Sequence, residues 1–302
     1  MFSKIKNGRK FWAVLALALV MGLILSGCGD SSGSADSSGE EEADEGEITF
    51  ESLSVVDNDY CSIEITGINE KNYTLDVELT NKTSDTTYMF AVYSASINGV
   101  EVETSLAETV SAGNSSIDEI EYYDDDLEEA GIDVYTDIEL SFHVYNNDDW
   151  EEDDVADVTV HVYPYGEENA TVYERETLET DNVIIDNDYV TVIVTGYGES
   201  DIWGYAMYLY LVNKTDTTVM FSIDEAAVNG YMCDPFWANE VPAGKSSFSS
   251  VYWYDSDLEE LGITDYSEIE TLEFLFTAYD SDNFDTEDYV SETITLNPEM
   301  SE

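Results

Sequence analysis

Residues 73–79, Tyr-Thr-Leu-Asp-Val-Glu-Leu, alternate between large apolar and polar side chains. A second stretch, residues 205–211, places Tyr, Met, Leu and Leu at every second position. A period of two puts the apolar side chains on one face of an extended strand and the others on the opposite face. Both stretches therefore predict strands of a sheet that is buried on one side, and they favour an all-β fold.

These two stretches belong to an internal repeat whose copies are about 130 residues apart. Matching motifs follow one another in the same order in both copies, which indicates a duplicated domain. We predict two tandem β-sandwich domains, residues 47–165 and 166–302, with an open barrel as the alternative. The matched motifs are Asp57-Asn58-Asp59-Tyr60 with Asp186-Asn187-Asp188-Tyr189, Asn81-Lys82-Thr83 with Asn213-Lys214-Thr215, and Asn98-Gly99 with Asn229-Gly230.

Local motifs predict the connections between strands. Asn98-Gly99 and Asn229-Gly230 lie between strand-like runs, and Asn and Gly accept the positive φ of a two-residue hairpin turn. One short helical connection is expected in each copy, at residues 124–130 and 255–261. Acidic residues suit the start of a helix, and a glycine follows each segment as a stop.

The N-terminus carries an export signal. Residues 1–10 include four basic residues, and residues 11–25 are apolar and uncharged. This apolar run of about 15 residues is short for a spanning helix, which needs roughly 20, and it fits a signal peptide better than an uncleaved membrane anchor. The run Leu25-Ser26-Gly27-Cys28 resembles the lipobox of bacterial lipoproteins. That resemblance implies removal of residues 1–27 and diacylglycerol on Cys28.

The next segment, residues 28–46, contains no apolar side chain larger than Ala after Cys28. Such a segment cannot bury enough surface to offset its ordering entropy, so we predict a disordered acidic and Ser/Gly-rich linker. Fully extended, its 18 residues after Cys28 span roughly 60 Å. The linker would hold the folded part clear of the membrane.

The predicted domains resemble the immunoglobulin-like domains of unknown function found on many Gram-positive surface lipoproteins. The resemblance rests on the lipobox, the acidic linker, the Asn-Lys-Thr turn after an alternating strand, and the Asn-Gly hairpin. It implies a lipid-anchored protein on the extracytoplasmic face of the cell membrane that acts in binding, adhesion or spacing. The family has no agreed catalytic residues, so none are assigned to this chain.

The charge balance limits the partners. The chain has 9 Lys and Arg against 68 Asp and Glu, a formal net charge of −59. Such a surface repels nucleic acid and anionic headgroups and attracts cations. We therefore expect no nucleic acid partner, attachment to the membrane through lipid alone, and an extracellular protein or glycan as ligand.

Catalytic motifs are missing from the sequence. His143 and His161 are the only histidines, and neither has the spacing of a nucleophile–base pair or of a zinc site. We interpret both as ordinary strand residues and expect no enzymatic activity. A carbohydrate hydrolase that uses two carboxylates stays as an alternative, since acidic residues are too many to nominate a pair.

Calcium is the cofactor with the most support in the sequence. Asp57 and Asp59, and likewise Asp186 and Asp188, have a spacing of two in turns, where carboxylates can converge on an ion. The alternative is that Asp and Asn favour turns by bonding their own backbone. We expect no obligatory cofactor, and a calcium-stabilised adhesion module remains the alternative function.

An aromatic segment of the second copy is the candidate binding surface. Tyr231, Phe236 and Trp237 follow its hairpin, and Trp203 is a further candidate; the first copy has Val and Glu after its hairpin instead. Such rings can recognise a protein or glycan; alternatively, they can enlarge a core or form the packing face between the two domains. Cys61 and Cys233 occupy non-equivalent positions, and we expect two half-buried thiols rather than a disulfide.

Overall fold

A computed structural model describes residues 47–298 except 124, 150, 201, 284 and 285. The predicted signal peptide, Cys28 and the whole linker lie outside the described residues. Within the described part, no helix has the length and apolar character needed to cross a membrane. Residues Glu45–Glu302 form one compact unit.

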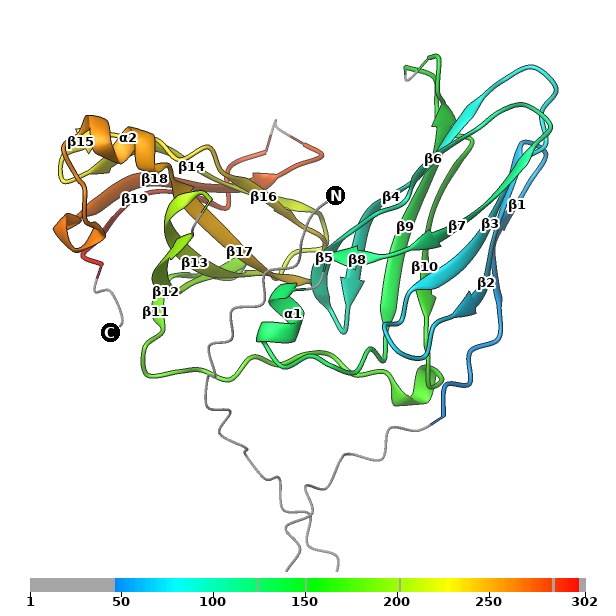
Figure 1. The fold of residues 1–302 in the computed structure, drawn as a ribbon, viewed down its shortest axis with the longest axis horizontal. Helices are drawn as coiled ribbons and strands as arrows, with labels where there is room; N and C mark the ends of the chain where they lie inside the picture. Colours follow the sequence, from blue (N-terminus) through cyan, green and yellow to red (C-terminus); the bar gives the residue numbers. More distant parts are fainter. Residues whose placement is uncertain (1–46, 124, 150, 201, 284–285, 299–302) are drawn as a thin grey trace, which may run out of the picture. The chain divides into compact units, whose positions relative to one another are not determined.

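Strands make up most of the regular secondary structure of the described chain, which confirms the predicted all-β fold class (Figure 1). Two α-helices occur among the described residues, close to where the acidic segments predicted them. The elements of the first copy are β1 (Leu53–Asp57), β2 (Cys61–Ile68), β3 (Leu75–Asn81), β4 (Tyr88–Ile97), β5 (Val100–Thr104), β6 (Ala107–Val110), β7 (Ser115–Ile120), β8 (Tyr122–Tyr123), α1 (Asp125–Glu129), β9 (Ile138–Asn146) and β10 (Ala156–Val162).

The second copy repeats this order after a single turn of 3₁₀ helix, η1 (Glu167–Asn169). Its elements are β11 (Asn182–Asp186), β12 (Val190–Ser200), β13 (Gly204–Asn213), β14 (Val219–Val228), β15 (Tyr231–Met232), β16 (Ala238–Val241), β17 (Ser246–Trp253), α2 (Asp255–Glu260), η2 (Tyr266–Glu268), β18 (Leu272–Asp280) and β19 (Val290–Leu296).

The strands form sandwiches of facing sheets. In the first copy, a four-stranded sheet with the order β1-β2-β3-β7 faces a sheet that contains β10, β9, β4 and β5. In the second copy, β11, β12, β13 and β17 face a sheet with the order β15-β14-β18-β19. One sheet runs through both copies, because β5 of the first pairs in parallel with β17 of the second.

Buried apolar side chains form two separate cores. The first contains side chains from both sheets of the first copy, such as Ile63, Leu75 and Phe90. The second does the same for the second copy and includes Trp253 and Phe274. The alternating strands supply these side chains, as the period of two requires. The exact boundary between residues 165 and 166 stays a prediction.

The Asn-Lys-Thr motif is explained by a buried asparagine. Asn81 is 1% exposed, and its Nδ2 donates to the carbonyls of Thr86 and Val110, both at 2.9 Å. Its Oδ1 accepts from the backbone N–H and hydroxyl of Thr83. Asn213 makes the same set of bonds in the second copy. The motif therefore ties the end of a strand to the neighbouring loop.

Replacing Asn81 with alanine is expected to lower the free energy of unfolding by about 2–4 kcal/mol, because buried carbonyls lose their donor. Urea unfolding followed by tryptophan fluorescence measures this loss. Asn114→Ala is the control, since this exposed side chain bonds only to neighbouring carbonyls. Equal effects of the two substitutions would contradict the structural role of the motif.

The hairpin turns form as predicted, with φ of 51° and 83° at Asn98 and Gly99 and nearly the same values at Asn229 and Gly230. One strand differs from the prediction. Tyr73 has a φ of 57°, so β3 begins at Leu75 rather than at Tyr73. A backbone bond from Tyr73 N–H to the Asn69 carbonyl closes a turn there and places the ring in the core.

The two thiols are free, as predicted, but the prediction that they are half-buried is wrong. Cys61 is fully buried in the first core, and Cys233 is 8% exposed and belongs to the second. Burial raises the pKa of both thiols, so both are held in the protonated form. Buried, protonated thiols pack as small apolar side chains and are poor nucleophiles.

Candidate functional site

The predicted calcium ligands lie at turns, where one carboxylate of each pair binds a lysine. Asp57 accepts from Lys82 Nζ, and Asp186 accepts from Lys214 Nζ at 2.7 Å. An ammonium group competes with a cation for these oxygens. Within the described residues, no group of three or more His, Cys, Asp or Glu side chains is arranged to hold a metal ion. Calcium binding that includes Asp59 and Asp188 stays a prediction.

The asparagine between these aspartates explains why the motif forms a turn. Asn58 Oδ1 accepts from the N–H groups of Tyr60 and Cys61, at 2.8 and 2.9 Å. Asn187 Oδ1 makes the equivalent pair of bonds to Tyr189 and Val190. Side-chain bonds of this kind stabilise turns without a metal.

Only some of the predicted aromatic side chains are exposed. Tyr231 and Phe236 are 64% and 97% exposed, and Trp203 is half exposed in the β12–β13 turn. Trp237 instead packs against the second core, and its Nε1 donates to Ser249 Oγ at 3.0 Å. Trp237 therefore belongs with the packing residues, whereas Tyr231 and Phe236 are available to a partner.

Each histidine lies between two carboxylates. His143 Nδ1 is 2.6 Å from Asp154, and its Nε2 is 3.4 Å from Asp157. Its ring stacks on Tyr93 with 4.1 Å between centroids. His161 has the same arrangement with Asp137 and Glu139 and stacks on Tyr163. A carboxylate thus lies beside each ring nitrogen. His143 lies within β9 and His161 within β10, so both are strand residues as interpreted.

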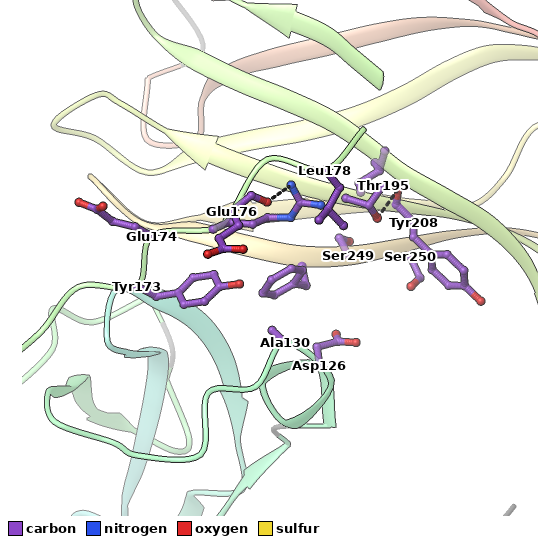
Figure 2. A pocket seen from close by; sticks show the side chains of 13 residues that line it. Asp126, Ala130, Tyr173, Glu174, Glu176, Leu178, Thr195, Tyr208, Ser249 and Ser250 are labelled. Carbon is purple, nitrogen blue, oxygen red and sulfur yellow. Dashed lines mark hydrogen bonds between the residues drawn. The ribbon is translucent and has the colours of Figure 1, made fainter. Parts of the chain in front are cut away.

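A cleft of about 520 Å³ lies where the second copy follows the first, and no sequence motif indicated it (Figure 2). Side chains far apart in the sequence meet there, from α1, from the segment before β11, and from the sheet of the second copy. The lining residues are Asp126, Ala130, Tyr173, Glu174, Arg175, Glu176, Leu178, Thr195, Tyr208, Leu209, Phe248, Ser249 and Ser250.

Aromatic rings and a fixed arginine shape the cleft. Tyr173 and Phe248 have centroids 6.2 Å apart, and Phe248 also packs against Tyr210 at 5.0 Å. Arg175 lies over the Tyr210 ring and binds both carboxylate oxygens of Asp181 at 2.7 Å. This bond raises the pKa of Arg175, so its charge is permanent and already neutralised by Asp181.

Polar groups complete the lining, beside the apolar side chains of Ala130, Leu178 and Leu209. Thr195 and Ser250 contribute hydroxyl groups, and the Thr195 hydroxyl donates to the Tyr208 carbonyl at 3.3 Å. The Ser249 hydroxyl instead accepts from Trp237 and donates to Asn239, both at 3.0 Å. Asp126 and Glu176 add negative charge (Figure 2). A small number of polar groups beside apolar rings is the usual composition of a ligand site. The cleft can therefore stack a flat or cyclic ligand and exchange hydrogen bonds with its hydroxyl or amine groups.

The two copies are joined beside this cleft by polar bonds. Ser246 N–H donates to the Gly99 carbonyl at 3.0 Å, and Ser247 Oγ donates to Glu101 Oε2 at 2.8 Å. Lys245 Nζ lies 2.7 Å from Glu139 Oε2, and both side chains are largely buried. Burial, reinforced by the charges of Glu103 and Asp126, raises the pKa of Glu101 to about 7.

Stability should fall as the pH rises through about 7, because Glu101 then loses its proton at the junction. The pKa of Glu101 in the folded state lies above the ordinary value of 4.5. The stability that protonation of Glu101 contributes is therefore fully present below pH 4.5 and is lost above pH 7. Glu101→Gln should be more stable than the wild type by about 1–3 kcal/mol at pH 8, and equally stable at pH 4.

Thermal unfolding at both pH values measures this difference. Glu121→Gln is the control, because Glu121 is an exposed carboxylate and is not one of the charges that raise the pKa of Glu101. If Glu101→Gln gains no more stability at pH 8 than this control, the result would contradict a proton held on the buried Glu101 side chain.

Comparisons with known proteins assign no family. No family model matches the sequence, and no curated protein matches it. Among solved structures, the chain is similar to a crystal structure of the YadV chaperone, with 11% identity and a TM-score of 0.24. The alignment covers 78% of this chain and 99% of that one. A likeness of this strength carries no argument about function.

Proposed function

We propose that this protein is a lipid-anchored binding module on the extracytoplasmic face of a bacterial membrane, with its ligand held in the cleft between the two copies. The Leu25–Cys28 lipobox and the acidic linker support the location. The observation that carries the binding role is the cleft itself, where rings and hydroxyls of the second copy lie beside carboxylates of both copies (Figure 2).

The chemistry of the cleft favours a neutral or cationic glycan. The Tyr173, Tyr208 and Phe248 rings offer apolar surfaces, which sugar rings cover with their C–H faces. The Ser250 hydroxyl can bond to sugar hydroxyls. Asp126, Glu174 and Glu176, within a chain of net charge −59, repel anionic polymers.

Binding without catalysis is the simplest role for this lining. A nucleophilic mechanism needs an activated side chain beside a base. The lining residues include no histidine, cysteine or lysine. The buried thiols of Cys61 and Cys233 are outside the cleft. The proposal therefore assigns the acidic side chains of the cleft to recognition.

Calorimetric titration with chitin, chitosan and β-glucan hexamers tests the proposal. Tyr208→Ala should weaken binding of the preferred hexamer about 2–12-fold, because a stacking ring contributes about 0.5–1.5 kcal/mol. Tyr60→Ala is the matched control, since Tyr60 is half exposed and is not part of the cleft. Absence of binding by every hexamer, or equal binding by both variants, would contradict a glycan site in the cleft.

A further inference from the structure

The junction between the two copies is an edge-to-edge strand contact. Val100 of β5 pairs with Ser246 of β17 in parallel. Phe248, two residues further along β17, packs against the first core. Val100 itself is fully buried. The contact therefore has two halves. The first copy supplies the hairpin half, which is the start of β5 at Val100, and the second copy supplies the edge-strand half, which is β17 from Ser246 to Phe248.

The repeat places a second hairpin half on the second copy. Gly230 and Tyr231 correspond to Gly99 and Val100, with nearly identical φ values at the two glycines. The strand that begins at Tyr231, β15, is the last strand of its sheet. Tyr231 and Met232 are each 64% exposed, although the equivalent Val100 is buried. Within the described part of the chain, no strand covers this apolar edge as β17 covers its counterpart.

A second edge-strand half lies on the first copy. Ser115 corresponds to Ser246, and Ile117 corresponds to Phe248. Their strand, β7, is also the last of its sheet, with the order β1-β2-β3-β7. Ile117 is 81% exposed, whereas Phe248 packs against the neighbouring copy. Exposed apolar side chains on a sheet edge mark a pairing surface.

We propose that the chain associates head to tail with a second copy of itself, with β15 of one molecule pairing to β7 of the next. This inference goes beyond the proposed ligand site and does not depend on it. In the proposed contact, Ser115 N–H donates to the Gly230 carbonyl, as Ser246 N–H donates to Gly99 within the chain. Ile117 takes the place of Phe248 beside the hairpin of the neighbouring molecule.

Such an interface is heterologous, so it leaves one free half at each end and permits chains of molecules. It should be weaker than the internal junction. Linkage within one chain supplies an effective concentration of about 1 mM, which separate molecules lack. The proposed contact also lacks the internal ion pair of Lys245 with Glu139. Asn114, which precedes Ser115, takes the place of Lys245. Glu273, which follows the β14–β18 pair Val228–Leu272, takes the place of Glu139.

Salt should strengthen the association. Molecules with this excess of acidic residues repel one another, and salt screens that repulsion, with a Debye length of about 30 Å at 0.01 M and about 3 Å at 1 M. An apolar strand contact does not lose its driving force in salt. We therefore expect larger species in 1 M sodium chloride than in 0.01 M.

Sedimentation velocity of residues 29–302 from about 10 µM to 1 mM tests the proposal. The wild type should form a concentration-dependent series of oligomers in 1 M salt. Ile117→Asp and Tyr231→Asp should each remain monomeric. An equimolar mixture of the two variants should form dimers and nothing larger, because each variant keeps the half that the other lacks. Ile202→Asp is the control, since Ile202 is 77% exposed in the β12–β13 turn and should leave the series unchanged.

Two outcomes would overturn the proposal. One is a wild type that stays monomeric at every concentration. The other is an Ile117→Asp variant that dimerises alone, which would show a symmetric contact through Tyr231. Asn114→Lys provides a second measurement: it restores the equivalent of Lys245 and should tighten association about 3–10-fold, as expected for an ion pair worth about 1 kcal/mol. An unchanged affinity would contradict the proposed register.

Discussion

A Cys28→Ser variant is expected to leave the membrane fraction and to be recovered in the soluble exported fraction. Diacylglycerol supplies two acyl chains, the number needed for stable anchoring, at about 0.8 kcal/mol for each buried CH₂ group. Serine cannot form the thioether. Fractionation followed by immunoblotting measures the shift, which should involve most of the protein.

The control is Ser32→Ala, a change in the linker that should leave the protein in the membrane fraction. A Cys28→Ser protein that resists washing with high salt and carbonate would contradict lipid anchoring. It would indicate that residues 11–25 remain as an uncleaved apolar anchor.

Gly204→Ala is expected to lower the stability of the second copy strongly. Gly204 begins β13 with a φ of 95°, a conformation that alanine adopts only with strain. An added Cβ would also contact the Trp253 carbonyl and lie 2.9 Å from the Asp255 N–H group. Strain and backbone overlap together should cost about 3–5 kcal/mol.

Gly262→Ala separates these two causes. Gly262 has a φ of 84°, but no atom lies within 4 Å of its added Cβ. This control should lose only about 1–2 kcal/mol, the cost of the left-handed conformation. Urea unfolding gives both values. If the Gly204→Ala protein is as stable as the Gly262→Ala protein, the backbone of β13 and β17 shifts to accommodate the methyl group, and the predicted cost of overlap is wrong.

Local sequence patterns predicted the fold where the cause is local. Alternation predicted β13 and most of β3, the Asn-Gly pairs predicted both hairpin turns, and acidic segments followed by glycine predicted α1 and α2. The start of β3 was predicted too early, because the turn that closes on Asn69 overrides the alternation at Tyr73. Strand propensity does not report such a turn.

Features that depend on distant contacts were not predicted. Trp237 resembled an exposed aromatic in the sequence, but Ser249 of another strand supplies the partner that fixes it at the core. The cleft brings Tyr173 and Phe248 together, 75 positions apart in the numbering, and no motif links them. The repeat did contain one clue: Phe248 corresponds to Ile117, and only one of them is covered by a neighbouring copy.

The central claim is that this protein binds a glycan without changing it. Incubation of residues 29–302 with the hexamers, followed by mass spectrometry of both bound and free sugar, tests the claim most directly. We predict that the preferred hexamer is recovered intact, and that its binding weakens in Tyr208→Ala. Shortened products that appear with the wild type and increase with time would contradict the claim and establish a hydrolase that uses paired carboxylates.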